Sequence, residues 1–138
     1  MTYSLNKKVK LSFEETIQKV TEELKKEGFG ILTQIDVKDT LKKKINQDFR
    51  AYTILGACNP QFAYKALTMD DKMGVFLPCN IVVQQHEDGQ VEISIGDPEE
   101  LMKPAANDAL LTFSQVVKNA MQRVLANITN PVSDPIQS

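Results

Sequence analysis

Two amphipathic helix patterns, one near each end of the chain, enclose a series of short strand-like segments. The first helix is predicted over 13–27, because Ser12 and Glu15 form a capping box before an apolar stripe and Gly28 follows as a stop. The second is predicted over 105–127 from a longer apolar stripe at helical spacing. Since each stripe must be covered, both helices are expected to pack on the structure that the intervening segments form.

Five segments have the alternation or the β-branched content that is typical of strands. They are residues 3–11, 29–35, 49–57, 75–84 and 91–95. Two short helices are predicted within this series. Asp36 is the expected cap of one that ends at Ile45. Asn59 is the expected cap of the other, which starts at Pro60 and continues to about residue 68.

This order of elements favours an α+β fold, with an antiparallel sheet that carries both long helices on one face. The run Asp97-Pro98-Glu99 is predicted as a break between the sheet and the last helix. Residues 1–129 form one predicted domain, and 130–138 a flexible tail. Because the second sheet face would remain open and apolar, we expect a partner there, and a homodimer is the simplest arrangement.

The composition excludes some classes of partner. Sixteen basic and eighteen acidic residues give a net charge of −2, which argues against a nucleic-acid binder that relies on bulk charge. No apolar stretch approaches the ~18–20 residues that cross a bilayer, and the first residues lack a secretory signal pattern. We therefore expect a cytoplasmic protein with two reduced cysteines, which binds neither nucleic acid nor membrane.

The two cysteines stand in closely matching settings. Cys58 lies in the run Leu-Gly-Ala-Cys-Asn-Pro and Cys79 in Phe-Leu-Pro-Cys-Asn, so an apolar strand leads into each thiol and an asparagine follows it. Cys58 comes just before a predicted helix, whose first amides would favour a thiolate. Cys79 follows a proline without a helix end, so its thiol is expected to be more ordinary. A small buried hydrophobe is the alternative for both.

Several short runs, together with the two cysteine segments, resemble the family called domain of unknown function 302. The runs are Gly28-Phe29-Gly30-Ile31-Leu32-Thr33, Ile35-Asp36-Val37 and Asp48-Phe49-Arg50. The resemblance covers about residues 28–98. It implies a TATA-binding-protein-like fold, β-α-β(4)-α, and a homodimer. It implies no activity, because the family is uncharacterised.

A candidate site follows from these residues. We expect Arg50, Cys58, Asn59, Cys79 and Asn80 to converge on a small-molecule pocket. Small-ligand binding is the first hypothesis. The alternatives are a thiol-based redox or sulfur-transfer protein, with Cys58 reactive and Cys79 resolving, and a non-catalytic dimeric interaction module.

Other readings of the same residues stay open. Arginine suits a planar carboxylate or phosphate, but Arg50 can also form an ion pair with Asp48. Asn59 has a structural role as a helix cap. The single histidine, His86, lies in a polar run and is expected on the surface. Two thiols without a CxxC or HxxxH spacing predict no metal site, and the sequence identifies no cofactor.

Overall fold

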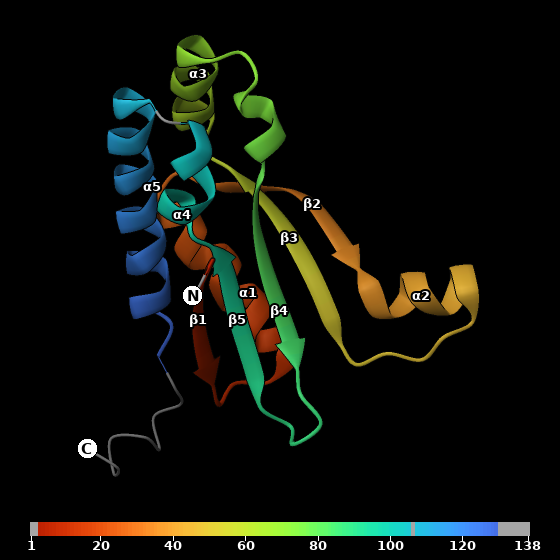
Figure 1. Cartoon of the computed structure of the whole chain (residues 1–138). Coiled ribbons are helices and arrows are strands. Elements are labelled where there is room, and N and C mark those ends of the chain that lie inside the picture. The colour runs from red at the N-terminus through yellow and green to blue at the C-terminus, as the bar shows by residue number, and fades with distance from the viewer. Residues whose placement is uncertain (1–2, 106, 130–138) are drawn as a thin grey trace.

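The computed structural model describes residues 3–105 and 107–129 (Figure 1). Its strands are β1 (Ser4–Val9), β2 (Gly30–Asp36), β3 (Tyr52–Cys58), β4 (Cys79–Gln85) and β5 (Val91–Gly96). Its α-helices are α1 (Phe13–Lys26), α2 (Val37–Ile45), α3 (Pro60–Met69), α4 (Pro98–Met102) and α5 (Asp108–Ala126). Two 3₁₀ helices complete the set, η1 (Met73–Phe76) and η2 (Lys103–Ala105).

The strands form one sheet in the order β1-β5-β4-β3-β2, and every neighbouring pair is antiparallel. The long helices α1 and α5 pack against each other on one face of this sheet. The predicted α+β fold is confirmed, with the two long helices on one face. The largest fully buried side chains come from both helices and the central strands: Val20, Leu24, Leu55, Ile81, Ile93, Leu110 and Met121.

Local side-chain chemistry sets the helix ends. Ser12 accepts a hydrogen bond from the Glu15 amide, and Glu15 reaches back to the Ser12 amide, so the predicted capping box is present. Asp36 accepts from the Asp39 amide and thereby caps α2. Asn59 caps α3, with a proline at its first position. These three predicted caps are confirmed.

The second sheet face is open but not apolar. Ile54 and Val82 are paired on it, and so are Tyr52 and Gln84 of the same two strands. Ser94 adjoins Val82 on β5. Polar and apolar side chains therefore alternate across this face. The prediction of a leftover apolar face is wrong, because the strands place their apolar residues toward the helices.

Three predicted boundaries differ from the structure. The predicted strand over 75–84 begins only at Cys79, because Met73 anchors the 3₁₀ helix η1 in the core. The strand predicted to start at 49 begins at Tyr52. The predicted break at residues 97–99 instead starts the helix α4, which Asp97 caps. The predicted flexible tail, 130–138, lies outside the described residues.

The segment from Gly30 to Arg50, which contains β2 and α2, has no buried side chain. It is called the arm below. Figure 1 shows α2 projecting from the sheet on the side away from α5. The backbone of the arm is nevertheless well paired, since β2 pairs with β3 on both sides of a register shift between Ile31 and Thr33, and Asn46 ends α2 in the left-handed region at φ 54°. The arm is thus well formed but almost uncovered.

In the part of the chain that the structure describes, no helix is long and apolar enough to span a bilayer.

Candidate functional site

The two cysteine segments lie side by side at one end of the sheet. Cys58 ends β3 and Cys79 starts β4, and Cys79 is paired with Ala57, the residue just before Cys58. Cys58, Asn59 and Cys79 line a small apolar void of about 20 Å³ beneath the aromatic ring of Phe62. That volume holds about one water molecule, so the void itself is too small for a ligand.

Both polar atoms of the Asn59 side chain form hydrogen bonds within the protein. Its side-chain oxygen accepts hydrogen bonds from the amides of Gln61 (3.0 Å) and Phe62 (3.2 Å), and its side-chain nitrogen donates to the Glu27 carbonyl (3.2 Å). Asn59 therefore joins the start of α3 to the end of α1. The neighbouring Gly28, at φ +85°, lies so close that a Cβ there would be 2.8 Å from the Asn59 side-chain nitrogen. The capping interpretation of Asn59 is confirmed.

Arg50 lies at the opposite end of the sheet. Its Nε donates to Gln84 (2.9 Å), and its guanidinium carbon is 4.5 Å from the centre of the Phe49 ring. Cys58 is the last residue of β3, about 20 Å from Tyr52 at the start of that strand, and Arg50 lies two residues before Tyr52. The predicted convergence of Arg50 with the cysteines is therefore wrong, because the extended strand β3 places Arg50 and Cys58 at opposite ends of the sheet.

The alternatives for Arg50 and His86 are settled by their partners. Asp48, the expected partner of Arg50, forms an ion pair with Lys42 instead (3.1 Å). His86 is half-buried and lies 2.8 Å from a Glu92 carboxylate oxygen. Both side chains line an open hollow at that far end, away from the cysteines. Among the described residues, no three His, Cys, Asp or Glu side chains gather where they could hold a metal ion.

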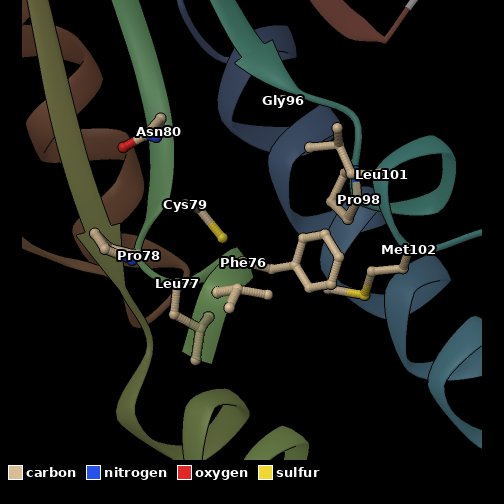
Figure 2. A pocket seen from close by; sticks show the side chains of 10 residues that line it. Phe76, Leu77, Pro78, Cys79, Asn80, Gly96, Pro98, Leu101 and Met102 are labelled. Carbon is tan, nitrogen blue, oxygen red and sulfur yellow. The ribbon is translucent and has the colours of Figure 1, made fainter. Parts of the chain in front are cut away.

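A larger cavity, of about 220 Å³, opens beside Cys79 and is called the apolar pocket below. In Figure 2, the Cys79 sulfur points toward Phe76 and Leu77, whereas the Asn80 side chain points the opposite way. The walls come from η1, the start of β4 and α4. The lining residues are Val75, Phe76, Leu77, Pro78, Cys79, Asn80, Gly96, Pro98, Leu101 and Met102.

The wall that α4 provides is fixed by charge. Asp97 caps α4 by accepting from the amides of Glu99 and Glu100, and its carboxylate forms an ion pair with Lys118 of α5 (3.0 Å). Lys118 also pairs with Glu99 (3.2 Å). The hydrogen bonds to Asp97 and Glu99 raise the pKa of Lys118. The Asp97 side chain is only 7% exposed, so this contact joins α4 firmly to α5.

Sequence reasoning missed the α4 side of the pocket. The residues Asp97-Pro98-Glu99-Glu100 have an N-cap, a first-turn proline and acidic residues in the first turn, which together are typical of a helix start. The prediction of a break is wrong because the amide hydrogen that proline lacks is not needed at the first helical position. The helix α4 that starts at Pro98 brings Leu101 and Met102 to the wall of the apolar pocket.

The Cys79 thiol is held in its protonated form. Burial and, to a smaller extent, the nearby Cys58, which would repel a second negative charge, together raise the pKa of Cys79 to about 11. Both cysteines are free thiols. Since the thiolate is the nucleophile, Cys79 at neutral pH acts as a small apolar wall rather than as a reactive group.

We expect Cys79 to react with iodoacetamide about tenfold more slowly in the folded protein than in the denatured chain at pH 8. A pKa of about 11 lowers the thiolate fraction roughly 100-fold, and the greater basicity restores roughly tenfold of the rate. The Cys58→Ser variant isolates Cys79, and mass spectrometry follows the adduct. Equal rates in the folded and denatured protein would show that burial does not protect this thiol.

The fold and the site together define a small α+β protein with an apolar pocket at one end of an antiparallel sheet. The chain belongs to the family described as domain of unknown function DUF302, whose model matches residues 5–128. The resemblance found in the sequence is thereby confirmed.

A crystal structure of an uncharacterized conserved protein of the same family, from Bacillus stearothermophilus, is similar over nearly the whole molecule. It is 32% identical, the match covers 91% of this chain and 95% of that chain, and the TM-score is 0.83. No curated protein matched this chain. The comparisons therefore support the fold and the family.

Proposed function

We propose that the protein binds a small apolar molecule, or the apolar part of a larger one, in the apolar pocket beside Cys79. The observation that carries this proposal is a cavity of about 220 Å³ whose rim exposes apolar side chains. Val75 is 81% exposed and Leu101 is 43% exposed. Burying such surface against a ligand is favourable by roughly 25 cal/mol per Å². This supports the earlier small-ligand hypothesis, with Cys79 and Asn80 in the lining.

The chemistry of the lining limits the ligand class. Within residues 3–105 and 107–129, no side chain that lines the apolar pocket is charged. A charged ligand group would lose its hydration there without gaining a counter-charge, which is strongly unfavourable. Cys79 remains neutral at physiological pH, since its pKa is about 11. An uncharged apolar group therefore fits best.

The thiol-based redox or sulfur-transfer alternative is less well supported. It requires Cys79 to resolve an intermediate as a thiolate, and the raised pKa of Cys79 opposes this. The two free thiols do support a reducing compartment, and we retain the cytoplasm as the proposed location.

Filling the apolar pocket by Leu101→Trp is expected to weaken the binding of 1-hexanol at least tenfold. The indole ring would occupy the space between α4 and η1 that the alcohol needs. Val116→Trp on α5 is the matched control, because Val116 is similarly exposed, at 47%, and does not line this pocket. Titration followed by the NMR shifts of Val75 and Leu77 measures the affinity.

Two results would contradict the proposal. One is the absence of hexanol binding in the unmodified protein at concentrations that leave it folded. The other is an equal effect of the two tryptophan substitutions, which would locate binding elsewhere.

We also propose that two copies of the chain associate through the arm, which supports the dimeric module as a second candidate. The strand β2 is an edge of the sheet, and its sequence from Gly30 to Ile35 has neither lysine nor proline. The opposite edge, β1, carries Lys7 and Lys8, which discourage pairing. Leu32 is 66% exposed on β2. Two identical strands can pair antiparallel about a twofold axis.

A twofold contact through α2 itself is an alternative to strand pairing, because antiparallel pairing of the whole of β2 would place the two α2 helices at opposite ends of the paired strands. The first turn of α2 carries Asp39 next to the Asp36 cap, and its last turn carries Lys42, Lys43 and Lys44. In an antiparallel pair of α2 helices, the acidic end of one would face the basic end of the other. The helix dipoles would also oppose each other favourably.

Under this proposal, light scattering with size exclusion gives twice the chain mass of 15.5 kDa at micromolar concentration. The double substitution Leu32→Lys and Ile35→Lys is expected to shift the species to monomer, because it charges the edge of β2. Val116→Lys is the control, since Val116 is exposed on α5 instead. A monomer in the unmodified protein would rule out the association.

A further inference from the structure

The apolar pocket adjoins a second hollow on the open sheet face. Asn80 and Gly96 line the pocket, and the same two residues line a groove of about 400 Å³ on that face, called the polar groove below. The groove is lined by Tyr3, Ser4, Tyr52, Asn80, Val82, Gln84, Ser94 and Gly96. The two hollows therefore meet at the point where β4 begins and β5 ends.

Two residues leave the junction between the hollows accessible: Gly96, which has no side chain, and Asn80, whose side chain forms no hydrogen bond among the described residues. Gly96 has no side chain, and a Cβ there would be only 3.0 Å from Leu101 Cδ1, so even a methyl group would crowd the boundary. Within the described part of the chain, the Asn80 side chain is exposed and makes no hydrogen bond. Figure 2 shows it pointing away from the Cys79 sulfur. Its amide is thus available to a ligand that passes this point.

The polar groove has a definite chemistry. Its side chains offer hydroxyl groups from Tyr52 and Ser94 and amide groups from Asn80 and Gln84. Among the described residues, no side chain that lines the groove is charged. A hydroxyl- or amide-bearing group can exchange its water for these partners. The nearest charges, Arg50 and Glu92, are of opposite sign and are already bonded to Gln84 and His86, so a charged group would gain no free counter-charge.

Size also favours a ligand that uses both hollows. Small-molecule sites usually have about 300–1,000 Å³. The apolar pocket alone, at about 220 Å³, falls below this range, and the adjoining groove of about 400 Å³ brings the combined space within it.

We infer that the ligand is an uncharged amphiphile, with its apolar end in the apolar pocket and a hydroxyl- or amide-bearing head in the polar groove. This inference rests on the proposed function of the apolar pocket. The junction at Asn80 and Gly96 is where the apolar and polar parts of the ligand would join.

The experiment compares probes that share a six-carbon chain, each kept below its micelle-forming concentration. The probes are 1-hexanol, hexyl glucoside, hexyl sulfate and hexyltrimethylammonium. We expect hexyl glucoside to bind about tenfold more tightly than 1-hexanol, since one or two net hydrogen bonds supply that factor. The two charged probes are expected to bind no more tightly than 1-hexanol.

The double variant Tyr52→Phe and Ser94→Ala removes two hydroxyls from the polar groove. It is expected to reduce the advantage of hexyl glucoside over 1-hexanol to threefold or less. Lys8→Gln is the control, because Lys8 belongs to the hollow beside Arg50 at the other end of the sheet. The advantage should remain about tenfold in that variant. Both affinities are measured in each variant, so the ratio does not depend on a general change in folding.

The outcomes separate the two proposals. If 1-hexanol binds but hexyl glucoside gains nothing, the amphiphile inference is overturned while the pocket proposal stands. Tighter binding of a charged probe than of hexyl glucoside also overturns it. If the advantage survives loss of the two groove hydroxyls, the head does not lie in the groove. If no probe binds, the pocket proposal fails and the amphiphile inference with it.

Discussion

Gly56→Ala is expected to lower the free energy of unfolding by about 2–3 kcal/mol, at the upper end of the usual cost of overpacking. Gly56 is buried in β3, and a Cβ there would be 2.8 Å from Cγ of Pro78 and closer still to the Thr33 hydroxyl. The hydroxyl can rotate away, but the proline ring is fixed to the backbone. The added methyl group would therefore push apart β3 and the start of β4.

Gly30→Ala is a suitable control for this substitution. Gly30 lies on the neighbouring strand β2, is exposed, and has no atom within 4 Å of the position of an added Cβ. We expect a change within about 0.5 kcal/mol there, as at most exposed sites. Urea unfolding of both variants provides the comparison. A loss below about 1 kcal/mol for Gly56→Ala would mean that the proline moves freely.

Gly56→Ala is also expected to affect the apolar pocket. Pro78 packs over Gly56 directly before Cys79, so the absence of a side chain at Gly56 determines how the chain enters the apolar pocket. A displaced Pro78 would shift the pocket wall. Hexanol binding by Gly56→Ala should therefore weaken even under conditions in which the variant remains folded.

Asp97→Ala is expected to cost about 2–3 kcal/mol of stability and to weaken hexanol binding. The substitution removes the cap of α4, worth about 1 kcal/mol, and the nearly buried partner of Lys118. Without both contacts, α4 is less firmly held against α5, and the wall formed by Leu101 becomes loose. Chemical denaturation and NMR titration measure the two effects.

Two further variants separate the cap from the charge. Asp97→Asn keeps a good capping side chain but removes the carboxylate, so its loss should be smaller than that of Asp97→Ala. Asp36→Ala removes the cap of α2, where no buried ion pair is present, and should cost about 1 kcal/mol. If Asp97→Ala costs no more than Asp36→Ala, the ion pair with Lys118 contributes nothing measurable.

The local signals in the sequence predicted most of the secondary structure. Ser12, Asp36 and Asn59 each act on amides two or three residues ahead, so their capping role depends only on neighbouring residues. The strand predicted from residue 75 failed for a different reason. A short apolar run fits a strand or a helical turn equally well, and the burial of Met73, which decides the matter, depends on tertiary packing.

The candidate site was only partly predictable. The two cysteine segments come together because β3 and β4 are antiparallel neighbours, and alternating strand patterns suggested this. The pocket also needs Leu101 of α4, a helix that Asp97 and Glu99 join to α5 through Lys118. Arg50 was misplaced because sequence proximity does not show which end of a strand faces a site. The clash that keeps Gly56 free of a side chain was likewise invisible.

The low burial of the arm affects how the protein unfolds locally. The residues of the arm are held by the ladder between β2 and β3, by helix caps and by the partly buried Ile31, which packs against the core, and no side chain of the arm is fully buried. Amide hydrogens in such a segment exchange through local openings that leave the rest of the protein intact. We therefore expect the arm to act as a separate cooperative unit, which detaches and re-forms without global unfolding.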